Sequence, residues 1–295
     1  MPSLQHTLSA GKTVVTAELT PPKGTDLSEL FAKAQALQGF VDAINVTESA
    51  RALMTMAPVA AARLLMERGT EAIVQMTARD RNRIAIQADL LGAAVLGVHN
   101  FVFMGGDPPQ VGDHPEAKPV FDLTASQMAA AARELTLGRD MGGKPLRGAP
   151  QLFVGATVNP GATDFQAEVA NTRRKFDAGV KFVQTQAVYD VTVLERFLDA
   201  VKPDGIAVLA GIIPLKSAKM ASWLNEKVPG IRVPDTLIRQ IGQAGGAEAE
   251  LERGIEIAAR LVAAVSRVCQ GVHVMAIGAE AHIPAILRQS GIRSG

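Results

Sequence analysis

Short apolar runs recur at fairly regular distances along the chain and are rich in β-branched residues. Each run is almost continuously hydrophobic, as strands are when a parallel sheet is covered by helices. The pattern predicts eight strands, at residues 13–19, 42–48, 71–77, 100–106, 151–158, 181–189, 206–214 and 272–278.

Stretches with helical periodicity separate these runs, and several of them end on glycine, as helices often do. The clearest lie at residues 27–40, 56–69, 81–97, 124–138 and 165–179. Because strand and helix alternate along the chain, we predict an α/β fold, a (β/α)8 TIM barrel that forms a single domain over residues 1–295. A doubly wound open sheet is the alternative. The long interval 233–270 before the last strand predicts an extra helix.

Composition says more about possible binding partners and compartment than about the fold. The chain has 30 basic and 29 acidic side chains, so its net charge of +1 does not favour binding to nucleic acid or an anionic membrane. Cys269 is the only cysteine, which excludes an internal disulfide and fits a reducing compartment. The sequence has neither a signal peptide pattern nor an apolar run of about 18 residues, so we expect a soluble, cytoplasmic protein.

Common cofactor and metal motifs are missing from the sequence. The histidines and Cys269 show no metal-ligand spacing, so no metal site is expected. No glycine-rich dinucleotide fingerprint, phosphate-binding P-loop or serine-hydrolase elbow occurs. Function must therefore be sought at the ends of the predicted strands, where the reacting groups of such barrels lie.

Glu18 lies near the end of the first predicted strand, just before a Pro-Pro turn, in the sequence "TAELTPP". A carboxyl in a partly desolvated barrel mouth has its charged form disfavoured, so we predict a raised pKa and a role as proton donor. Pairing with a nearby lysine or capping of a helix is the alternative.

Asp107 follows Gly105 and Gly106 and precedes two prolines, within a long Gly/Pro-rich loop at 106–122. Loops of this length in compact domains are often functional. The glycines allow the backbone to approach a planar ligand closely, and the acid could accept from a ring N–H or stabilise a developing cation. A structural turn aspartate is the alternative.

The basic run 173–175 lies on the helix between the fifth and sixth predicted strands. A solvated helix face is the usual meaning of such a cluster, and it is the interpretation that the residues alone favour. Binding of a cofactor's phosphates is the alternative.

Several segments together resemble the methylenetetrahydrofolate reductase family. They are "AELTPP", "NVTESARA", "FVFMGGDPP", "RRKFDAGVKFVQTQAVYD", "GIIPLKSAKMASWLNEKVPGIRVP" and "GVHVMAIG". They occur in the family's order and span nearly the whole chain, and the set is far more specific than any one member. The resemblance implies a (β/α)8 barrel that uses a flavin to reduce 5,10-methylenetetrahydrofolate to 5-methyltetrahydrofolate, with electrons from NADH or NADPH.

The resemblance also implies roles for individual residues. Glu18 matches the family's general acid, which helps to open the five-membered ring of the folate to an iminium ion. Asp107 matches the acid that contacts the pterin and the flavin, and Gln186 matches a glutamine that binds folate. Met220 stands at a folate-contacting position. The flavin and nicotinamide positions are Thr47, Glu48, Ala50, Gln75, Gly105, Gly106, Thr157, Asn159, Asn171, Arg174 and Lys175.

Some of these positions differ from the better-known members of the family. Gly105 replaces an arginine, Thr157 a tyrosine, Gln75 a flavin-facing histidine and Met220 a glutamine. These differences resemble a branch from anaerobes and one-carbon-metabolising bacteria, in which a separate protein can deliver electrons.

The resemblance leaves several alternatives open. The flavin is FAD, FMN or a weakly held flavin, and the reaction runs toward reduction or oxidation, on this folate or a related pterin. Another alternative is a folate- or flavin-binding subunit that is active only with an electron-transfer partner. Members of the family are commonly homo-oligomers.

Overall fold

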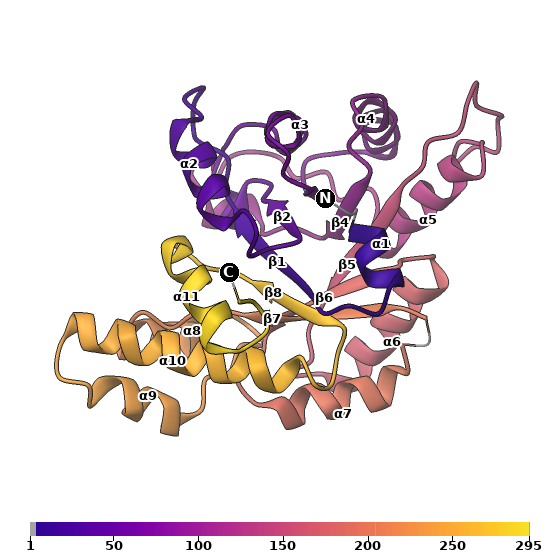
Figure 1. Ribbon diagram of the computed structural model, residues 1–295. Helices are drawn as coiled ribbons and strands as arrows, with labels where there is room; N and C mark the ends of the chain where they lie inside the picture. The colour runs from indigo at the N-terminus through magenta and orange to yellow at the C-terminus, as the bar shows by residue number, and fades with distance from the viewer. Residues whose placement is uncertain (1–3, 204, 295) are drawn as a thin grey trace.

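The computed structural model describes residues 4–203 and 205–294, and in them eight strands form a closed parallel barrel (Figure 1). Each strand pairs with the next in sequence, and the last pairs with the first, which confirms the predicted TIM barrel and excludes the open sheet. The strands are β1 (Val14–Leu19), β2 (Ala43–Val46), β3 (Ala72–Thr77), β4 (Asn100–Met104), β5 (Phe153–Val158), β6 (Phe182–Ala187), β7 (Ala207–Ile212) and β8 (Gly271–Val274).

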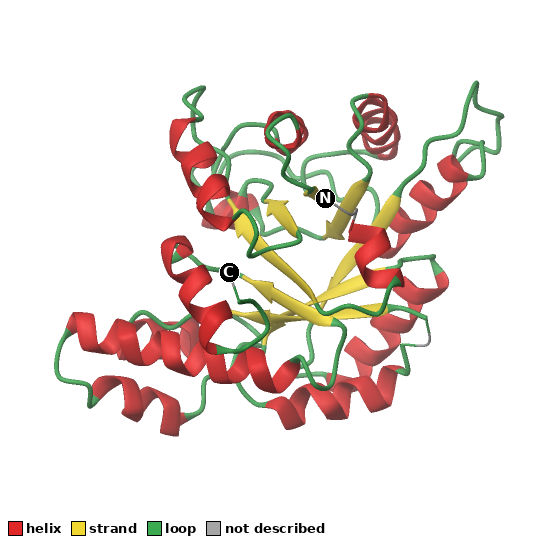
Figure 2. Ribbon diagram, in the orientation of Figure 1, coloured by secondary structure: helices red, strands yellow, loops and turns green. Residues whose placement is uncertain are grey.

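Helices surround the barrel on the outside (Figure 2). They are α1 (Leu4–Ser9), α2 (Ser28–Leu37), α3 (Pro58–Met66), α4 (Arg83–Val95), α5 (Ala125–Thr136), α6 (Phe165–Asp177), α7 (Val191–Val201), α8 (Ala218–Lys227), α9 (Asp235–Gly242), α10 (Ala247–Val265) and α11 (Ile283–Gln289). The long interval before β8 holds α9 and α10, so the predicted extra helix is present. In the described part of the chain, no helix combines the length and apolarity needed to span a bilayer.

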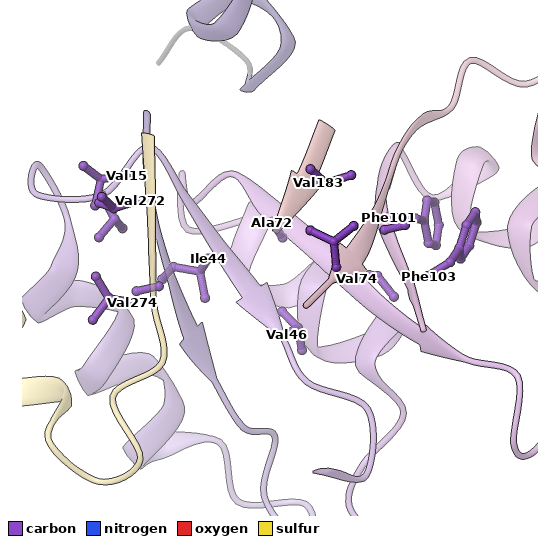
Figure 3. Close-up of a cluster of buried hydrophobic side chains, with 14 of the residues drawn as sticks. Val15, Ile44, Val46, Ala72, Val74, Phe101, Phe103, Val183, Val272 and Val274 are labelled. Carbon is purple, nitrogen blue, oxygen red and sulfur yellow. The ribbon is translucent and has the colours of Figure 1, made fainter. Parts of the chain in front are cut away.

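Alternate strand residues face the helices and make the main hydrophobic core. Val74 and Phe103 belong to this outward set, as do the other side chains labelled in Figure 3. The inward residues nearest the N-terminal ends of the strands are also apolar and form a second cluster with Leu4 of α1. That short helix, which the hydrophobic pattern does not predict, thus closes the lower end of the barrel.

The next inward layer is polar although it is buried. Thr16, Asn45, Gln75, Gln184 and His273 come from β1, β2, β3, β6 and β8, and each is at most 6% exposed. Buried polar groups are costly unless they are hydrogen-bonded. Here Thr16 pairs with His273 and Asn45 with Gln184, while Gln75 donates to Glu18. This polar layer forms the floor of the cavity above it.

Two loops face each other at the C-terminal ends of the strands. One follows β2 and contains the 3₁₀ helix η1 (Ala50–Ala52), and the other follows β4 and contains η2 (Pro109–Val111). Ser49, Arg51 and Ala52 adopt left-handed backbone conformations, which are uncommon for residues with a side chain. Such strain persists only where the surroundings fix the backbone, and it often marks functional sites.

Candidate active site

A cavity of about 440 Å³ opens at the C-terminal ends of the strands. Its volume lies within the range of about 300–1,000 Å³ that small-molecule sites occupy. The residues predicted from the sequence that line it are Glu18, Gln75, Gly105, Gly106, Asp107, Thr157, Asn159, Lys175 and Gln186. The structure therefore brings both predicted catalytic acids to one cavity.

Glu18 lies at the end of β1, with its side chain 24% exposed. Its Oε1 accepts a hydrogen bond from Gln75 Nε2 at 2.5 Å and lies 3.1 Å from His273 Nε2. Within residues 4–203 and 205–294, no hydrogen bond reaches Oε2. One carboxyl oxygen is thus fixed by side chains from β3 and β8, while the other is available to a ligand.

The prediction of a raised pKa for Glu18 is wrong in sign. Burial does raise the pKa of this carboxyl, but the hydrogen bond and the charge of His273, followed by the hydrogen bond from Gln75, outweigh it. The pKa therefore lies below its ordinary value. The sequence argument considered desolvation alone and missed the partner on β8.

His273 is the functional candidate that sequence reasoning did not identify. Its side chain is 3% exposed, its Nε2 faces Glu18, and its Nδ1 lies 2.8 Å from Thr16 Oγ1. Gln184 Nε2 approaches the same Nδ1 at 3.4 Å and pairs through its amide with Asn45. A usable signal existed, because Thr16, Gln184 and His273 stand two positions before the cavity-lining residues Glu18, Gln186 and Met275, and strand side chains two positions apart point to the same face.

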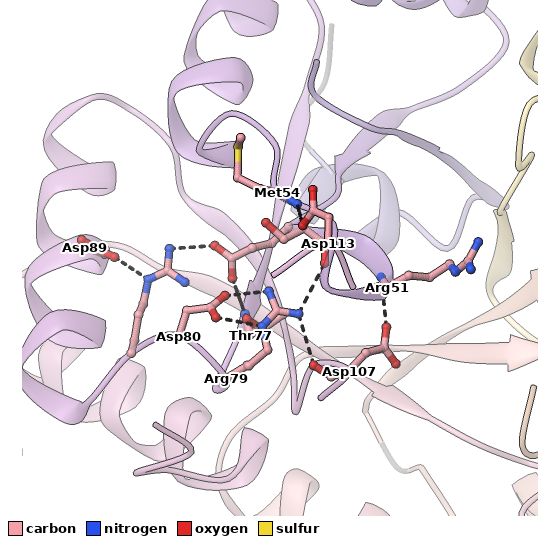
Figure 4. Close-up of polar contacts among 11 residues, drawn as sticks. Arg51, Met54, Thr77, Arg79, Asp80, Asp89, Asp107 and Asp113 are labelled. Carbon is pink, nitrogen blue, oxygen red and sulfur yellow. Dashed lines mark hydrogen bonds and ion pairs between the residues drawn. The ribbon is translucent and has the colours of Figure 1, made fainter. Parts of the chain in front are cut away.

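Asp107 is exposed at the rim, on the loop after β4. Its Oδ2 accepts the backbone N–H of Arg51 at 3.0 Å, and Arg79 donates to its carbonyl oxygen at 3.3 Å (Figure 4). On the same loop, Asp113 accepts the N–H of Met54 at 3.0 Å. The two aspartates therefore attach the β4 loop to the strained segment after β2.

The two glycines before Asp107 differ in their surroundings. Gly106 has φ +88°, and a Cβ there would lie 2.9 Å from Cβ of Thr77. Gly105 has open space around the same position. Only Gly106 is therefore required by the backbone, while Gly105 leaves the rim of the cavity open where a side chain could have stood.

Lys175 provides the buried cation of the cavity. It projects from α6, and its Nζ donates to the carbonyl oxygen of Thr157 at 2.7 Å. Burial lowers the pKa of Lys175, the charge of Glu168 raises it, and that of Arg174 lowers it. A buried ammonium beside a carbonyl and a carboxylate is suited to a ligand with phosphate or hydroxyl oxygens.

The basic run is divided between cavity and solvent. Arg173 and Arg174 are exposed, and Arg173 donates to the carbonyl of Ala200 on α7. Asn171 donates to Glu168 at 3.3 Å and does not line the cavity. The solvated-face interpretation thus describes the two arginines, whereas Lys175 points inward.

The remaining predicted residues lie outside the cavity lining. Thr47 is buried and donates to the hydroxyl of Thr20. Glu48 is buried and forms an ion pair with Arg81 at 2.7 Å, so its charge is already compensated. Ala50 is exposed on η1, and Met220 packs on the small core around α8 and α9.

The cavity has the properties that a flavin or a pterin requires. Met104, Val158 and Met275 offer apolar surface to a planar ring, and Gly105 offers backbone without a side chain. Thr157, Asn159, Gln186 and Lys175 add polar groups along one side. These residues fit a ring system with a polar chain attached.

The family model and the sequence relatives point to one family. The family described as methylenetetrahydrofolate reductase matches residues 3–291. A Pectobacterium carotovorum protein named 5,10-methylenetetrahydrofolate reductase is 27% identical over 230 residues, which cover 74% of this chain and 71% of that protein. An Escherichia coli protein of the same name is 31% identical over 144 residues, covering 47% of this chain and 48% of its own length.

A solved structure shares the fold over nearly the whole chain. It is described as an uncharacterized protein from Clostridium thermocellum that binds two copies of 5-methyl-5,6,7,8-tetrahydrofolic acid. The TM-score is 0.67 with 14% sequence identity, covering 98% of this chain and 99% of that one. At this identity the similarity concerns the fold.

Proposed function

The chain belongs to the methylenetetrahydrofolate reductase family, and on this premise we propose that it interconverts 5,10-methylenetetrahydrofolate and 5-methyltetrahydrofolate with a bound flavin. The observation that carries the proposal is the convergence of Glu18 and Asp107 on one cavity at the C-terminal rim of the barrel. Reduction of the folate needs a proton for the departing ring amine and an anion near the resulting cation.

Glu18 supplies the proton in this proposal. The lowered pKa leaves the Glu18 carboxyl ionised at neutral pH in the ligand-free site, so in this proposal the proton is taken up when a bound ligand displaces water from the carboxyl. It sits on Oε2, because Oε1 is already occupied by Gln75 and His273. The proton passes to the amine nitrogen as the carbon–nitrogen bond of the five-membered ring breaks. Asp107 at the opposite side of the cavity stabilises the cationic iminium, and Gln186 orients the pterin.

A reduced flavin, when bound, supplies the hydride. Gln75, Gly105, Gly106, Thr157 and Asn159 would hold its ring, and Lys175 would hold the polar chain, with Arg174 outside the lining. Thr47, Glu48 and Ala50 lie beside this space and are assigned to the nicotinamide donor only through the family resemblance.

The test separates the two half-reactions. The purified protein is mixed anaerobically with FAD or FMN, and visible absorbance reports flavin binding. The flavin is then reduced with NADH, NADPH or dithionite, and methylenetetrahydrofolate is added. We expect reoxidation of the flavin and formation of methyltetrahydrofolate. Flavin that is bound and reduced but is never reoxidised by the folate would refute the proposal.

A second candidate is a folate- or flavin-binding subunit that turns over only with an electron-transfer partner. It is favoured by Gly105 and Thr157, which stand where the better-known members carry an arginine and a tyrosine. The same experiment distinguishes it, because the chemically reduced flavin bypasses the missing donor. Turnover with dithionite but not with NADH or NADPH indicates a protein donor. Folate binding without turnover under any donor indicates a binding subunit.

A further inference from the structure

We propose that His273 is a positioning residue that presents Glu18 for proton transfer, and that the two side chains share their protons as one titrating pair. The inference deepens the proposed function and rests on it for the identity of the substrate. It is carried by a chain of hydrogen bonds in the barrel floor, from Asn45 through Gln184, Thr16 and His273 to Glu18.

The first part of the argument concerns the two oxygens of Glu18. Both Gln75 and His273 approach Oε1, and they come from strands on either side of β1 and β2. Two contacts from separate strands fix the plane of the carboxyl group. Oε2 receives no hydrogen bond from the described residues, so it is the oxygen that the ring amine of a bound folate can use.

The second part concerns the other nitrogen of the His273 ring. When Nδ1 is unprotonated, Thr16 Oγ1 can donate to it across 2.8 Å. When Nδ1 is protonated, the same hydroxyl can accept from it and turn its own hydrogen toward the carbonyl oxygen of Val272, at 3.5 Å. Rotation of one hydroxyl thus allows Thr16 to serve either protonation state of the ring, whereas Gln184 Nε2, which lies 3.4 Å from the same nitrogen and can only donate, favours the unprotonated one.

The third part concerns the charged groups around the pair. β2, β3 and β6 contribute the neutral side chains Asn45, Gln75 and Gln184 to the floor. The other ionisable groups lining the cavity are Asp107 on the β4 loop and Glu168 and Lys175 on α6. None of these three groups forms a hydrogen bond with Glu18 or His273 in the described chain. Among the ionisable groups that line the cavity, Glu18 and His273 are therefore in direct contact only with each other.

Two ionisable groups in contact lose their protons in steps that belong to the pair. A positive His273 stabilises the Glu18 carboxylate, while a neutral ring with hydrogen on Nε2 still donates to Oε1 and leaves Oε2 able to hold a proton. After Oε2 has given its proton to the substrate amine, the resulting Glu18 carboxylate still accepts from Gln75 and His273. Solvent then restores the proton.

The variants separate hydrogen bonding from ionisation. His273→Gln retains an amide donor for Glu18 but cannot become charged. We expect the alkaline limb of folate-dependent flavin reoxidation to move to higher pH by at least about 1 unit, because the cation that favours the Glu18 carboxylate is gone. Thr16→Val removes the hydroxyl that accepts from protonated Nδ1 of His273. We therefore expect the alkaline limb of flavin reoxidation in this variant to move in the same direction.

His99→Gln is the matched control, because His99 is exposed and its ring Nδ1 contacts the carbonyl oxygen of Gln151, away from the cavity lining. Its profile should coincide with that of the wild type. A His273→Gln profile that also coincides with the wild type would overturn the inference, while the proposed function would stand. No folate turnover in the wild type would instead remove the proposed function.

A measurement on the wild-type protein alone does not depend on substrate or on the folding of variants. Carbon-13 labels in the Glu side-chain carboxyls and the His rings are followed by NMR across the pH range. We expect the Glu18 and His273 signals to share their inflections, since each reports the charge of the other. Independent single inflections at different pH values would refute the pair.

Discussion

The floor and the rim of the cavity hold their carboxylates in different ways. In the floor, Glu18 stands on a strand and is bonded by side chains from β3 and β8. At the rim, Asp107 and Asp113 stand on one loop and accept backbone N–H groups of another. Breaking a floor contact therefore changes one side chain, whereas breaking a rim contact releases a loop.

The difference follows from how each region is built. Floor residues belong to a closed barrel whose register is fixed by eight strand pairings, so their positions are over-determined. Rim residues lie on connections that include left-handed backbone at Ser49, Arg51 and Ala52. Sites on strands hold reacting atoms more precisely than sites on loops, and loops adapt more readily to a ligand. We infer that proton transfer belongs to the floor and ligand capture to the rim.

The largest expected effect comes from the floor. Glu18→Gln keeps the shape of the side chain and removes its proton, so we expect folate-dependent reoxidation of the flavin to slow by about 10²–10⁴-fold. Reduction of the flavin by its donor should change little, because that step needs no proton from Glu18. Stopped-flow absorbance measures both half-reactions on one sample.

An equal loss in both half-reactions would contradict this assignment. It would mean that the variant disturbs flavin binding rather than proton transfer, and Glu18 would then belong with the binding residues of the rim.

The second prediction concerns two adjacent glycines at the rim. Gly106→Ala forces a side chain into left-handed backbone and against Thr77, and we expect it to lower the free energy of unfolding by about 1–3 kcal/mol. Gly105→Ala meets open space and should change it by less than about 0.5 kcal/mol. Urea denaturation measures both. Similar values for the two variants would show that the loop relaxes around either methyl group.

Much of the fold follows from local sequence patterns. A buried strand needs a continuous apolar run and a helix needs its own periodicity, so both are visible without knowledge of the partners. The same patterns miss α1, which is too short for a clear period and is held by Leu4 inside the barrel. Strand ends could also be predicted, which is why Glu18 and Gln186 were found.

The floor network could not be predicted in the same way. Thr16 and His273 are 257 residues apart in sequence, and Asn45 and Gln184 are 139 apart. Their contact depends on closure of the barrel and on register, which no local pattern contains. The predicted sign of the Glu18 pKa shift was wrong for this reason. The sign depends on His273, which comes into contact with Glu18 only when β8 pairs with β1.

The third prediction compares two rim aspartates. Asp107→Asn retains an acceptor for the N–H of Arg51 but removes the charge that faces the cavity. We expect kcat/KM for the folate to fall about tenfold, or about 1.4 kcal/mol in transition-state stabilisation, because the exposed charge is partly screened by solvent. Asp113→Asn is the matched change on the same loop. It faces Met54 and Lys23 instead of the cavity.

Steady-state kinetics of the two variants decide between charge and loop anchoring. If Asp113→Asn lowers kcat/KM as much as Asp107→Asn does, the rim acts by holding its loops together, and Asp107 is a structural turn aspartate.

The smallest effect is a pH dependence of stability that belongs to the floor. The pKa of Glu18 is below its ordinary value of 4.5 in the folded chain, chiefly because of His273, so the unfolded chain binds the proton more tightly. The stabilising contribution of Glu18 is therefore complete above pH 4.5 and is lost as the pH falls through the lower, folded pKa. Urea unfolding from about pH 6 to pH 3 should show a shallower loss of stability in Glu18→Gln, and in His273→Gln, than in the wild type. Equal slopes in all three proteins would mean that the pKa of Glu18 is the same in the folded and the unfolded chain.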